Sequence, residues 1–365
     1  MKIQLTQQNL SQALALMSRV ASTRTELPIL ANVLIDATET GITLSATNLE
    51  IAVLHQTAAK VSEPGKIAIP ARLFHEFVSQ LPKDQIVNLT LEKNKVLVTA
   101  GGYSSHIQGV EPEDFPALPH IDSEQYVEVK NEQLINAATK TLLAASRDET
   151  RPVLGGVFTH VHKGVLYFTA TDGYRLAESQ LVKTNTQTSS IIPLQSLQEV
   201  LKIAQDSSEE SGRLYLTNEQ FAFVSGETTL VSRVVEGAYP EYRKLIPEKS
   251  DINVTLEKTA FQTAAKLAGL FARESGGSIT ISAAEESGEV TIASVASQVG
   301  DNTSAIPAKV IGSGSVVVNV RYLNDALNCF DSKEVTFRFG DSIAPCVLTS
   351  KEQPGYQHIV MPLKS

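Results

Sequence analysis

The sequence contains very little cysteine, and none of it is arranged for cross-linking. Cys329 and Cys346 are the two cysteines among 365 residues, and they form neither a disulfide framework nor a Cys-x-x-Cys metal motif. Such usage is typical of proteins in a reducing compartment. The chain has no apolar run long enough to span a bilayer, which takes about 18 residues, and its N-terminus lacks an apolar signal core. We therefore expect a cytoplasmic protein that starts at Met1 and has no membrane partner.

The sequence also lacks the local motifs of the common enzyme classes. There is no Walker loop, no Gly-x-Ser-x-Gly, no His-Glu-x-x-His and no Gly-x-Gly-x-x-Gly. The glycine pairs at 101–102, 155–156 and 276–277 precede no phosphate-binding helix with a lysine, so we interpret them as turns. Because no nucleophile can be matched with a base, we expect neither catalysis nor a cofactor.

One pair of histidines has the spacing of a metal site. His160 and His162 stand two residues apart and would share one face of a strand. A zinc site needs three or four ligands, and no third candidate is near in the sequence. We therefore favour an ordinary surface strand here and expect no metal.

Negative charge predominates over the whole chain. Forty acidic residues against 31 basic ones give a formal net charge of −9, while 42% hydrophobic residues are typical of a globular protein. A nucleic-acid partner is disfavoured by this sum, so any such partner would require basic residues gathered in one place. The length fits two or three domains.

One pattern occurs three times. A short alternating strand followed by a helix starts at Val127, and the same pattern lies 124 residues earlier at Ile3 and 127 residues later at Val254. Both shifts keep the strand period of two and the helix period of 3.6 in register. The expected apolar helix positions are Leu10, Ala13, Leu14 and Met17; Leu134, Ala137, Ala138 and Thr141; and Phe261, Ala264, Ala265 and Ala268.

Further landmarks repeat at nearly the same distance. Ile69-Pro70 recurs as Ile192-Pro193, and Phe115-Pro116 recurs as Tyr239-Pro240. In the first copy we expect strands at 26–30, 41–47, 65–70, 86–91 and 95–99 and a helix at 71–81; in the third, a strand at 316–320 and a helix at 321–330. The period is too long for a solenoid. We therefore predict an α+β protein of three tandem domains, 1–123, 124–250 and 251–365, each with two helices packed on antiparallel sheets.

Acidic residues are absent from the first helix of every repeat. The windows 1–25, 133–147 and 258–273 contain no Asp or Glu but eight Lys or Arg. Solvated helices with cations near their C-termini would explain part of this pattern through the helix dipole. The alternative is a locally positive surface that touches phosphates without recognising bases.

Four segments together are distinctive of one family. They are Thr150-Arg-Pro-Val-Leu154, Thr169-Ala-Thr-Asp-Gly-Tyr-Arg-Leu-Ala177, Tyr239-Pro-Glu-Tyr-Arg243 and Val360-Met-Pro-Leu363. With the threefold repeat, the whole chain resembles the bacterial DNA polymerase III beta subunit, the sliding clamp. The resemblance implies DNA-clamp domains that form a ring as a head-to-tail homodimer around duplex DNA, independent of sequence, in the nucleoid. It also implies a non-catalytic processivity factor that tethers the polymerase at the primer end.

The resemblance further implies a peptide-binding groove between domains 2 and 3. Its partners would be the DNA polymerase III alpha subunit, the clamp loader delta subunit, and other polymerases and repair proteins, each through a short linear peptide. The residues carried over are Leu154, Thr171, Gly173, Tyr174, Arg175, Leu176, Pro240, Lys244, Leu245, Asn319, Tyr322, Ile343, Pro345, Val360, Met361, Pro362 and Leu363. Without the family, Asp172-Gly173 would be interpreted as a hairpin turn and residues 359–363 as a terminal strand.

Two positions depart from the family pattern. Gly276 lies where an aromatic lining residue is expected, and Gln195 lies where a basic residue is common. The expected DNA contacts are Arg24, Arg72, Lys140, Arg147, Lys202, Lys258, Lys266, Arg273 and Arg321. The expected contacts between the two copies are Phe74, Phe77, Leu270 and Phe271, for which ordinary core packing is the alternative.

Two functions thus remain open from the sequence. The first is a non-enzymatic ring that makes DNA synthesis processive. The second is a monomeric three-domain binding or metabolic protein in which the repeat is only a scaffold, and it would require a buried polar constellation that the sequence does not reveal.

Overall fold

The computed structural model describes residues 1–21, 27–121, 123–296, 300–340 and 343–363. By internal contacts the chain forms two compact units: residues 1–132 with 198–234, and residues 133–197 with 235–365. We refer to them as unit 1 and unit 2. Among the described residues, none of the helices has the length and hydropathy that a membrane span requires.

Unit 1 contains two antiparallel sheets, with strand orders β5-β1-β7-β8-β9 and β10-β15-β16-β17-β4-β3-β2-β6. Strands of the first and middle repeats share the larger sheet, because β4 pairs with β17 from Ile51–Ser232 to His55–Thr228. The strands are β1 (Lys2–Thr6), β2 (Asn32–Thr38), β3 (Gly41–Thr47), β4 (Ile51–Thr57), β5 (Lys60–Glu63), β6 (Gly65–Pro70), β7 (Ile86–Glu92), β8 (Lys95–Ala100), β9 (Tyr103–Gln108), β10 (Val127–Lys130), β15 (Ser211–Leu216), β16 (Gln220–Ser225) and β17 (Thr228–Arg233).

Unit 2 also contains two antiparallel sheets, with orders β14-β11-β12-β13-β26-β25-β24-β18-β22 and β21-β20-β19-β23. Here β13 of the middle repeat pairs with β26 of the third repeat. The strands are β11 (Gly156–His162), β12 (Val165–Thr171), β13 (Arg175–Lys183), β14 (Ser189–Pro193), β18 (Ile252–Glu257), β19 (Ser278–Ala284), β20 (Glu289–Ala296), β21 (Gly300–Pro307), β22 (Lys309–Ile311), β23 (Gly314–Asn319), β24 (Glu334–Phe339), β25 (Cys346–Thr349) and β26 (Tyr356–Val360).

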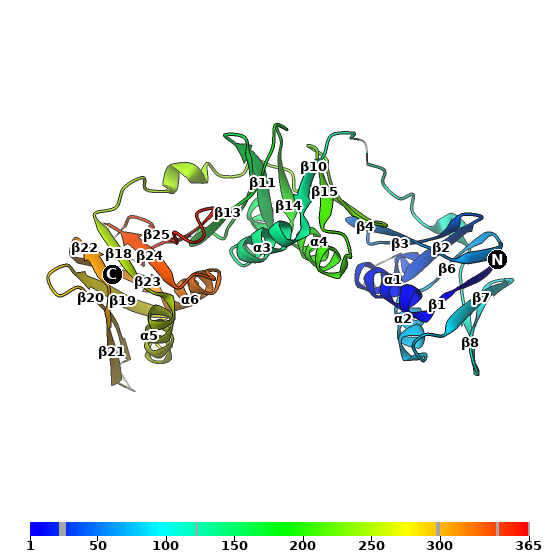
Figure 1. Cartoon of the computed structure of the whole chain (residues 1–365), viewed down its shortest axis with the longest axis horizontal. Coiled ribbons are helices and arrows are strands. Elements are labelled where there is room, and N and C mark those ends of the chain that lie inside the picture. Colours follow the sequence, from blue (N-terminus) through cyan, green and yellow to red (C-terminus); the bar gives the residue numbers. More distant parts are fainter. Residues whose placement is uncertain (22–26, 122, 297–299, 341–342, 364–365) are drawn as a thin grey trace. The chain divides into compact units, whose positions relative to one another are not determined.

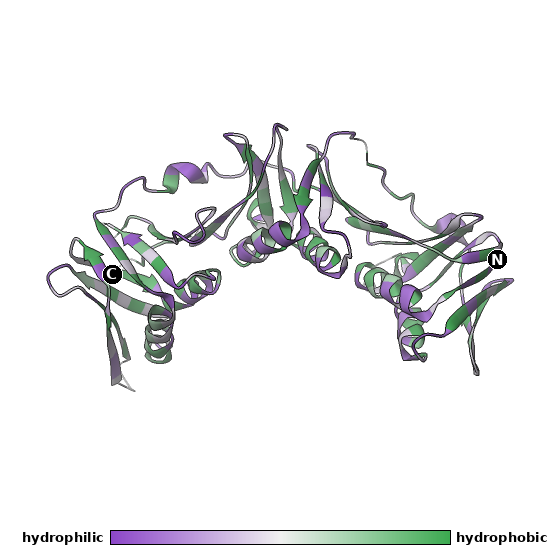
Figure 2. Ribbon diagram, viewed as in Figure 1, coloured by the Kyte–Doolittle hydropathy of each residue, from purple (hydrophilic) through white to green (hydrophobic). Residues whose placement is uncertain are grey.

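The helices follow the predicted rhythm of two per repeat. They are α1 (Gln7–Val20), α2 (Ala71–Gln80), α3 (Asn131–Leu142), α4 (Leu194–Asp206), α5 (Lys258–Phe271) and α6 (Val320–Asn328). In unit 1, α1 and α2 lie side by side, and α1 covers β3 and β4; in unit 2, α5 lies beside α6 (Figure 1). Each of these helices carries both apolar and polar residues (Figure 2), as an amphipathic helix on a sheet must.

The predicted apolar helix faces are confirmed. All twelve positions named above are buried, including Leu10, Leu134 and Phe261. Thr141, the one polar member, satisfies its hydroxyl by donating to the carbonyl of Ala137 at 2.8 Å, so its burial leaves no unpaired donor. α1 begins where the Thr6 hydroxyl accepts the backbone N–H of Asn9, which is a standard N-cap.

Some predicted boundaries were wrong. Residues 28–31 are not a strand but a 3-10 turn, Pro28–Ala31, with Pro28 in the first position, where proline's missing N–H costs nothing. The same turn recurs in the middle repeat as Pro152–Gly155. Val320 belongs to α6 rather than to the preceding strand, because the side chain of Asn319 caps the helix at that point.

Phe74 contributes to the core of unit 1, where its side chain is completely buried. Replacing Phe74 with alanine should lower the free energy of unfolding by about 3–5 kcal/mol, because the substitution leaves a cavity. Urea unfolding followed by circular dichroism measures this loss. Gln80, at the end of the same helix, is exposed, so Gln80→Ala is the matched control and should leave stability within about 0.5 kcal/mol of the unsubstituted chain. Equal losses from both substitutions would contradict this assignment.

Candidate peptide surface and nucleic-acid surface

The turn between β12 and β13 is fixed by its own side chains. The Thr171 hydroxyl donates to the carbonyl of Arg175 at 2.6 Å and accepts the N–H of Gly173 at 3.0 Å. Asp172 Oδ1 accepts the N–H groups of Tyr174 at 2.9 Å and Arg175 at 3.0 Å. Gly173 has φ +91°, a conformation that a side chain would strain. The hairpin predicted for Asp172-Gly173 is therefore present.

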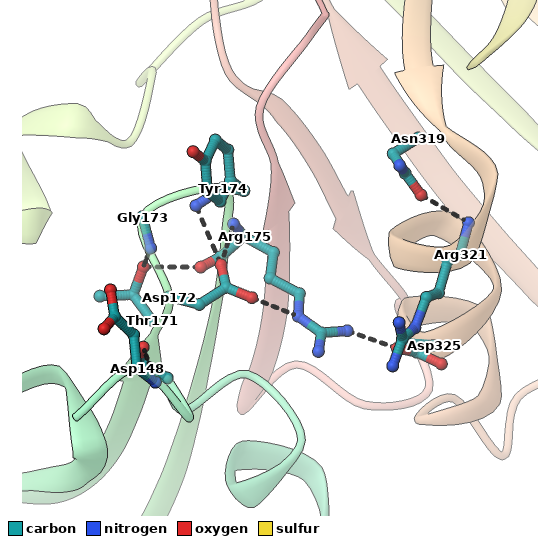
Figure 3. Close-up of polar contacts among 10 residues, drawn as sticks. Asp148, Thr171, Asp172, Gly173, Tyr174, Arg175, Asn319, Arg321 and Asp325 are labelled. Carbon is teal, nitrogen blue, oxygen red and sulfur yellow. Dashed lines mark hydrogen bonds and ion pairs between the residues drawn. The ribbon is translucent and has the colours of Figure 1, made fainter. Parts of the chain in front are cut away.

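Arg175 connects this turn to α6. Its Nε lies 3.1 Å from Asp172 Oδ2, and its Nη1 lies 2.5 Å from Asp325 Oδ2. Figure 3 shows the guanidinium between these two carboxylates, one from the hairpin turn and one from the helix. The centre of the guanidinium is also 4.8 Å from the ring of Tyr322, within cation–π range.

The C-terminal segment runs beside the same turn. β26 pairs with β13 so that Val360 lies opposite Arg175. The N–H of Met361 then donates to the carbonyl of Tyr174 at 2.8 Å, and that of Leu363 donates to Val317 at 2.8 Å. The terminal strand predicted for 359–363 therefore ends at Val360, and the next three residues continue along the turn and β23.

A small apolar core lies beneath this surface. It consists of Leu176, Tyr242, Val347 and Ile359, each almost fully buried. Tyr242 opens the short helix Tyr242–Leu245, which contains Lys244 and Leu245, and its N–H donates to the carbonyl of Pro240 at 2.7 Å.

The apolar side chains above the core are open to solvent. Tyr174 is 57% exposed, Leu245 is 61% exposed and Ile343 is 73% exposed. The ring of Tyr174 stacks on that of Tyr322, with centroids 6.4 Å apart and planes 17° from parallel. Exposed apolar side chains suit a flexible apolar ligand better than they suit water. We refer to the turn 171–175, Tyr322 and the exposed side chains of Leu245 and Ile343 as the turn–helix surface.

Contacts or sequence neighbours link the other expected members to this turn–helix surface. A side chain at Gly173 would lie 3.6 Å from Arg151 Nη1, and the backbone carbonyl of Arg151 accepts the N–H of Leu154. Pro345 precedes Cys346, which pairs with Val360. Asn319 caps α6 three residues before Tyr322. At Gly276, where the family pattern has an aromatic residue, an added Cβ would meet no atom within 4 Å, so the surface is open on that side.

A buried polar cluster lies on β11–β13 and was not recognised from the sequence. Glu178 accepts hydrogen bonds from Tyr242 Oη and, at 2.8 Å, from Gln357 Nε2, and it forms an ion pair with Arg243 at 2.7 Å. His160 Nε2 lies 3.1 Å from Tyr242 Oη. Tyr242 and Arg243 belong to the Tyr-Pro-Glu-Tyr-Arg segment. Its high density of tyrosine and charged residues is the sequence feature that could have indicated this cluster.

The expectation that His160 lies on a surface strand was wrong. Its side chain is buried and its ring stacks on Phe158 with centroids 4.5 Å apart. Burial, reinforced by the charge of Arg243, lowers the pKa of His160 to about 4. Among the described residues no three His, Cys, Asp or Glu side chains are grouped as metal ligands. Cys329 and Cys346 are both buried as free thiols.

The nine cations expected to contact DNA divide into four groups. Arg24 lies outside the described residues. Arg72 and Lys202 are exposed but paired with acids of their own helices, Glu76 at 3.3 Å and Glu199 at 2.7 Å. No ion pair is found within the described ranges for four exposed cations, which remain able to bind phosphate: Arg147, Lys266, Arg273 and Arg321.

Lys140 and Lys258 do not present free ammonium groups. The side chain of Lys140 is 8% exposed, and its Nζ lies 3.4 Å from Asp331 and above the ring of Tyr356. Lys258 Nζ donates to the carbonyl of Phe330 at 2.7 Å. The ammonium group of Lys140 is therefore not free for a DNA contact, because it stabilises the packing between α3 and the residues at the end of α6.

The acid-free windows correspond to α1, α5 and most of α3. α3 begins at Asn131, so Glu132 is in its first turn, where the helix dipole favours a negative charge. In α1, Arg19 pairs with Glu199 at 3.0 Å. The scarcity of acid is thus real along these helices, but part of their positive charge is neutralised internally.

Comparison with known proteins identifies the family over nearly the whole sequence. Models of the DNA polymerase III beta subunit match in chain order: the N-terminal domain at 1–119, the central domain at 128–241 and the C-terminal domain at 243–364. The chain belongs to the DNA polymerase III beta subunit family. It is accordingly a sliding clamp, which encircles DNA and tethers the polymerase, and it is a non-catalytic subunit.

Relatives and solved structures agree with this assignment. The beta sliding clamp of Staphylococcus aureus is 30% identical over 358 residues, 95% of each chain, and that of Staphylococcus epidermidis is 29% identical over the same length. The structure of the DNA polymerase sliding clamp from Bacillus subtilis matches with a TM-score of 0.94 at 26% identity, over 100% of this chain and 99% of that one. The Caulobacter crescentus beta subunit matches at 0.93 and 26%, over 100% of both chains.

The residues expected at the contact between two clamp subunits differ in exposure. Phe74 is completely buried, so this residue is core, as the alternative interpretation had it. Leu270 is 55% exposed, while Phe77 and Phe271 are partly exposed. Leu73 and Leu267 are also exposed. They lie four residues before Phe77 and Phe271, on the same helix faces.

His358 provides a pH test of this part of the clamp. It is fully buried beside Tyr356, and burial, followed by the charge of Arg175, lowers its pKa from 6.5 to about 3. The unfolded chain thus binds a proton that the folded chain does not, and stability falls as the pH drops below about 6.5. Between pH 7 and pH 5 this residue should contribute a loss of about 2 kcal/mol.

Urea unfolding at the two pH values measures this slope. His358→Gln should be less stable than the unsubstituted chain at pH 7, but its stability should decline less towards pH 5. If His358→Gln lost as much stability between pH 7 and pH 5 as the unsubstituted chain does, the assignment to His358 would be contradicted.

Proposed function

We propose that two copies of this chain join head to tail around duplex DNA, and that the turn–helix surface binds short apolar peptides of its partners. The single observation that carries the peptide proposal is the exposure of the apolar side chains of Tyr174, Leu245 and Ile343, the first of which lies in a fixed turn. A preformed surface binds a flexible peptide without first paying to order itself. The partners proposed are the polymerase alpha subunit, the clamp loader delta subunit, and other polymerases and repair proteins.

The proposed contact between the copies joins α2 of one to α5 of the other. Its apolar residues are Leu73 and Phe77 on α2 and Leu267, Leu270 and Phe271 on α5. The outer strands β9 and β21 support this arrangement, because in the described residues each is hydrogen-bonded on one side only. Unpaired strand edges invite pairing with another chain.

The proposed DNA contacts are Arg147, Lys266, Arg273 and Arg321, the exposed cations for which the described residues show no ion pair. They offer phosphate contacts without amide or aromatic groups for reading bases, so binding would be independent of sequence and weakened by salt. We place the protein in the cytoplasm at the nucleoid, where such DNA is found. We also propose repeat boundaries at 123/124 and 250/251. The first falls between the matches of the N-terminal and central family models, whereas the match of the C-terminal model begins earlier than the second, at residue 243.

The topological proposal makes a distinct prediction for DNA retention. After loading by a clamp loader, the protein should remain on closed circular DNA and leave within minutes once the circle is cut, because only geometry retains it. Gel filtration of the DNA-bound fraction measures retention. Leu270→Arg is the control: it should be a monomer by light scattering and should not be retained on either form. Equal retention of the unsubstituted protein on circular and linear DNA would refute the ring.

The peptide proposal predicts the effect of a short truncation. Deleting residues 361–365 removes Met361, Pro362 and Leu363 and should weaken the binding of an apolar peptide at least about 30-fold, since hot-spot residues cost 2 kcal/mol or more. The dimer mass should not change. Deleting only residues 364–365 is the matched control and should leave peptide binding intact. Fluorescence anisotropy with a labelled peptide measures the affinity of both variants. If the longer deletion binds the peptide as tightly as the unsubstituted protein does, the peptide site lies elsewhere on the molecule.

A further inference from the structure

Asp325 is not among the residues expected to touch a peptide, yet it joins the two sides of the turn–helix surface. It lies in α6, in the third repeat, and its carboxylate reaches Arg175 of the middle repeat at 2.5 Å. In Figure 3 the carboxylate of Asp325 faces the guanidinium from the helix side. Its own side chain is partly exposed, whereas that of Arg175 is only 10% exposed.

Arg175 has a fixed position because its donors are divided between two carboxylates. The carboxylate of Asp172 accepts a hydrogen bond from Nε of Arg175 and also accepts two backbone N–H groups of the turn. Asp325 takes Nη1. The Asp172 contact lies within one turn of chain, so it fixes Arg175 to its own hairpin. The Asp325 contact is the charge-assisted bond that crosses to the helix.

The aromatic pair depends on this crossing. Tyr322 lies three residues before Asp325, on the same face of α6, and its ring is 4.8 Å from the Arg175 guanidinium. Tyr174, one residue before Arg175, stacks on Tyr322 from the hairpin side. Each of the two rings therefore adjoins one end of the Arg175–Asp325 ion pair.

We propose that Asp325 is a positioning residue for peptide binding, which fixes the Tyr174–Tyr322 stack by linking Arg175 to α6. This inference rests on the proposed peptide function of the turn–helix surface. Without the Asp325 carboxylate, Arg175 keeps its contact with Asp172, but the bond between turn and helix is lost. Tyr174 then gains rotational freedom that binding must remove again, which weakens affinity without removing any peptide contact.

The experiment measures binding of a fluorescein-labelled eight-residue peptide containing leucine and phenylalanine, by anisotropy. Asp325→Asn, which preserves the shape of the side chain and removes its charge, should weaken binding about tenfold. Asp325→Glu restores the carboxylate and should recover most of that loss. Asp36→Asn is the matched control, because Asp36 also pairs with a cation, Lys66 at 3.1 Å, but belongs to unit 1. It should bind as the unsubstituted protein does.

A double substitution separates positioning from general damage. If Asp325 acts through the stack, adding Asp325→Asn to Tyr174→Ala should cost no further affinity, since the ring that it positions is already gone. Additive losses in this cycle would overturn the proposal, as would unweakened binding by Asp325→Asn. If the circular dichroism spectrum shows that Asp325→Asn does not fold, Asp325→Glu is measured in its place. The proposal would be overturned if Asp325→Glu bound the peptide as weakly as Tyr174→Ala does.

The outcomes distinguish this inference from the function on which it rests. If the unsubstituted protein fails to bind the peptide, and the truncation of residues 361–365 makes no difference, the peptide function itself is wrong. If the unsubstituted protein binds, the truncated one does not, and Asp325→Asn binds normally, the surface stands and only the role of Asp325 is rejected.

Discussion

Antiparallel strand pairing between repeats is the constraint on which both compact units depend. The pair β4–β17 joins the first and middle repeats in unit 1, and the pair β13–β26 joins the middle and third repeats in unit 2. Each pair satisfies backbone groups that would otherwise form open sheet edges. The second pair has a functional consequence, because it brings the hairpin of one repeat beside the C-terminal segment of another.

Charge in this protein is organised by neutralisation as much as by exposure. The net charge is −9, and the helices poorest in acid still direct several of their cations inwards or onto neighbouring acids. Lys140 and Lys258 support packing at α6, and Arg19 joins α1 to Glu199 of α4. The positive charge left for phosphate is therefore small. This suits a clamp that must encircle DNA without adhering to it, since every neutralised phosphate adds salt-dependent affinity.

The turn–helix surface combines a fixed frame with open side chains. Hydrogen bonds from Thr171 and Asp172 fix the backbone of the turn, and the Arg175 ion pairs attach it to α6. Above this frame, Tyr174 and Ile343 remain exposed. The buried cluster around Glu178 and Tyr242 fixes the segment that joins the middle and third repeats to the same sheet. Polar groups thus supply the geometry, while apolar groups are left for binding.

The sequence by itself determined the threefold repeat, the helix faces and the place of the β12–β13 turn. These follow from periodicity and from local chemistry, as at Thr141 on its helix face and at Gly173 with its positive φ. Tertiary structure alone decided that Phe74 is core, that Lys140 and His160 are buried, and that Asp325 meets Arg175. Residues 150 positions apart become neighbours only through strand pairing and helix packing, and a side chain's exposure depends on what packs against it. Neither is encoded in local sequence.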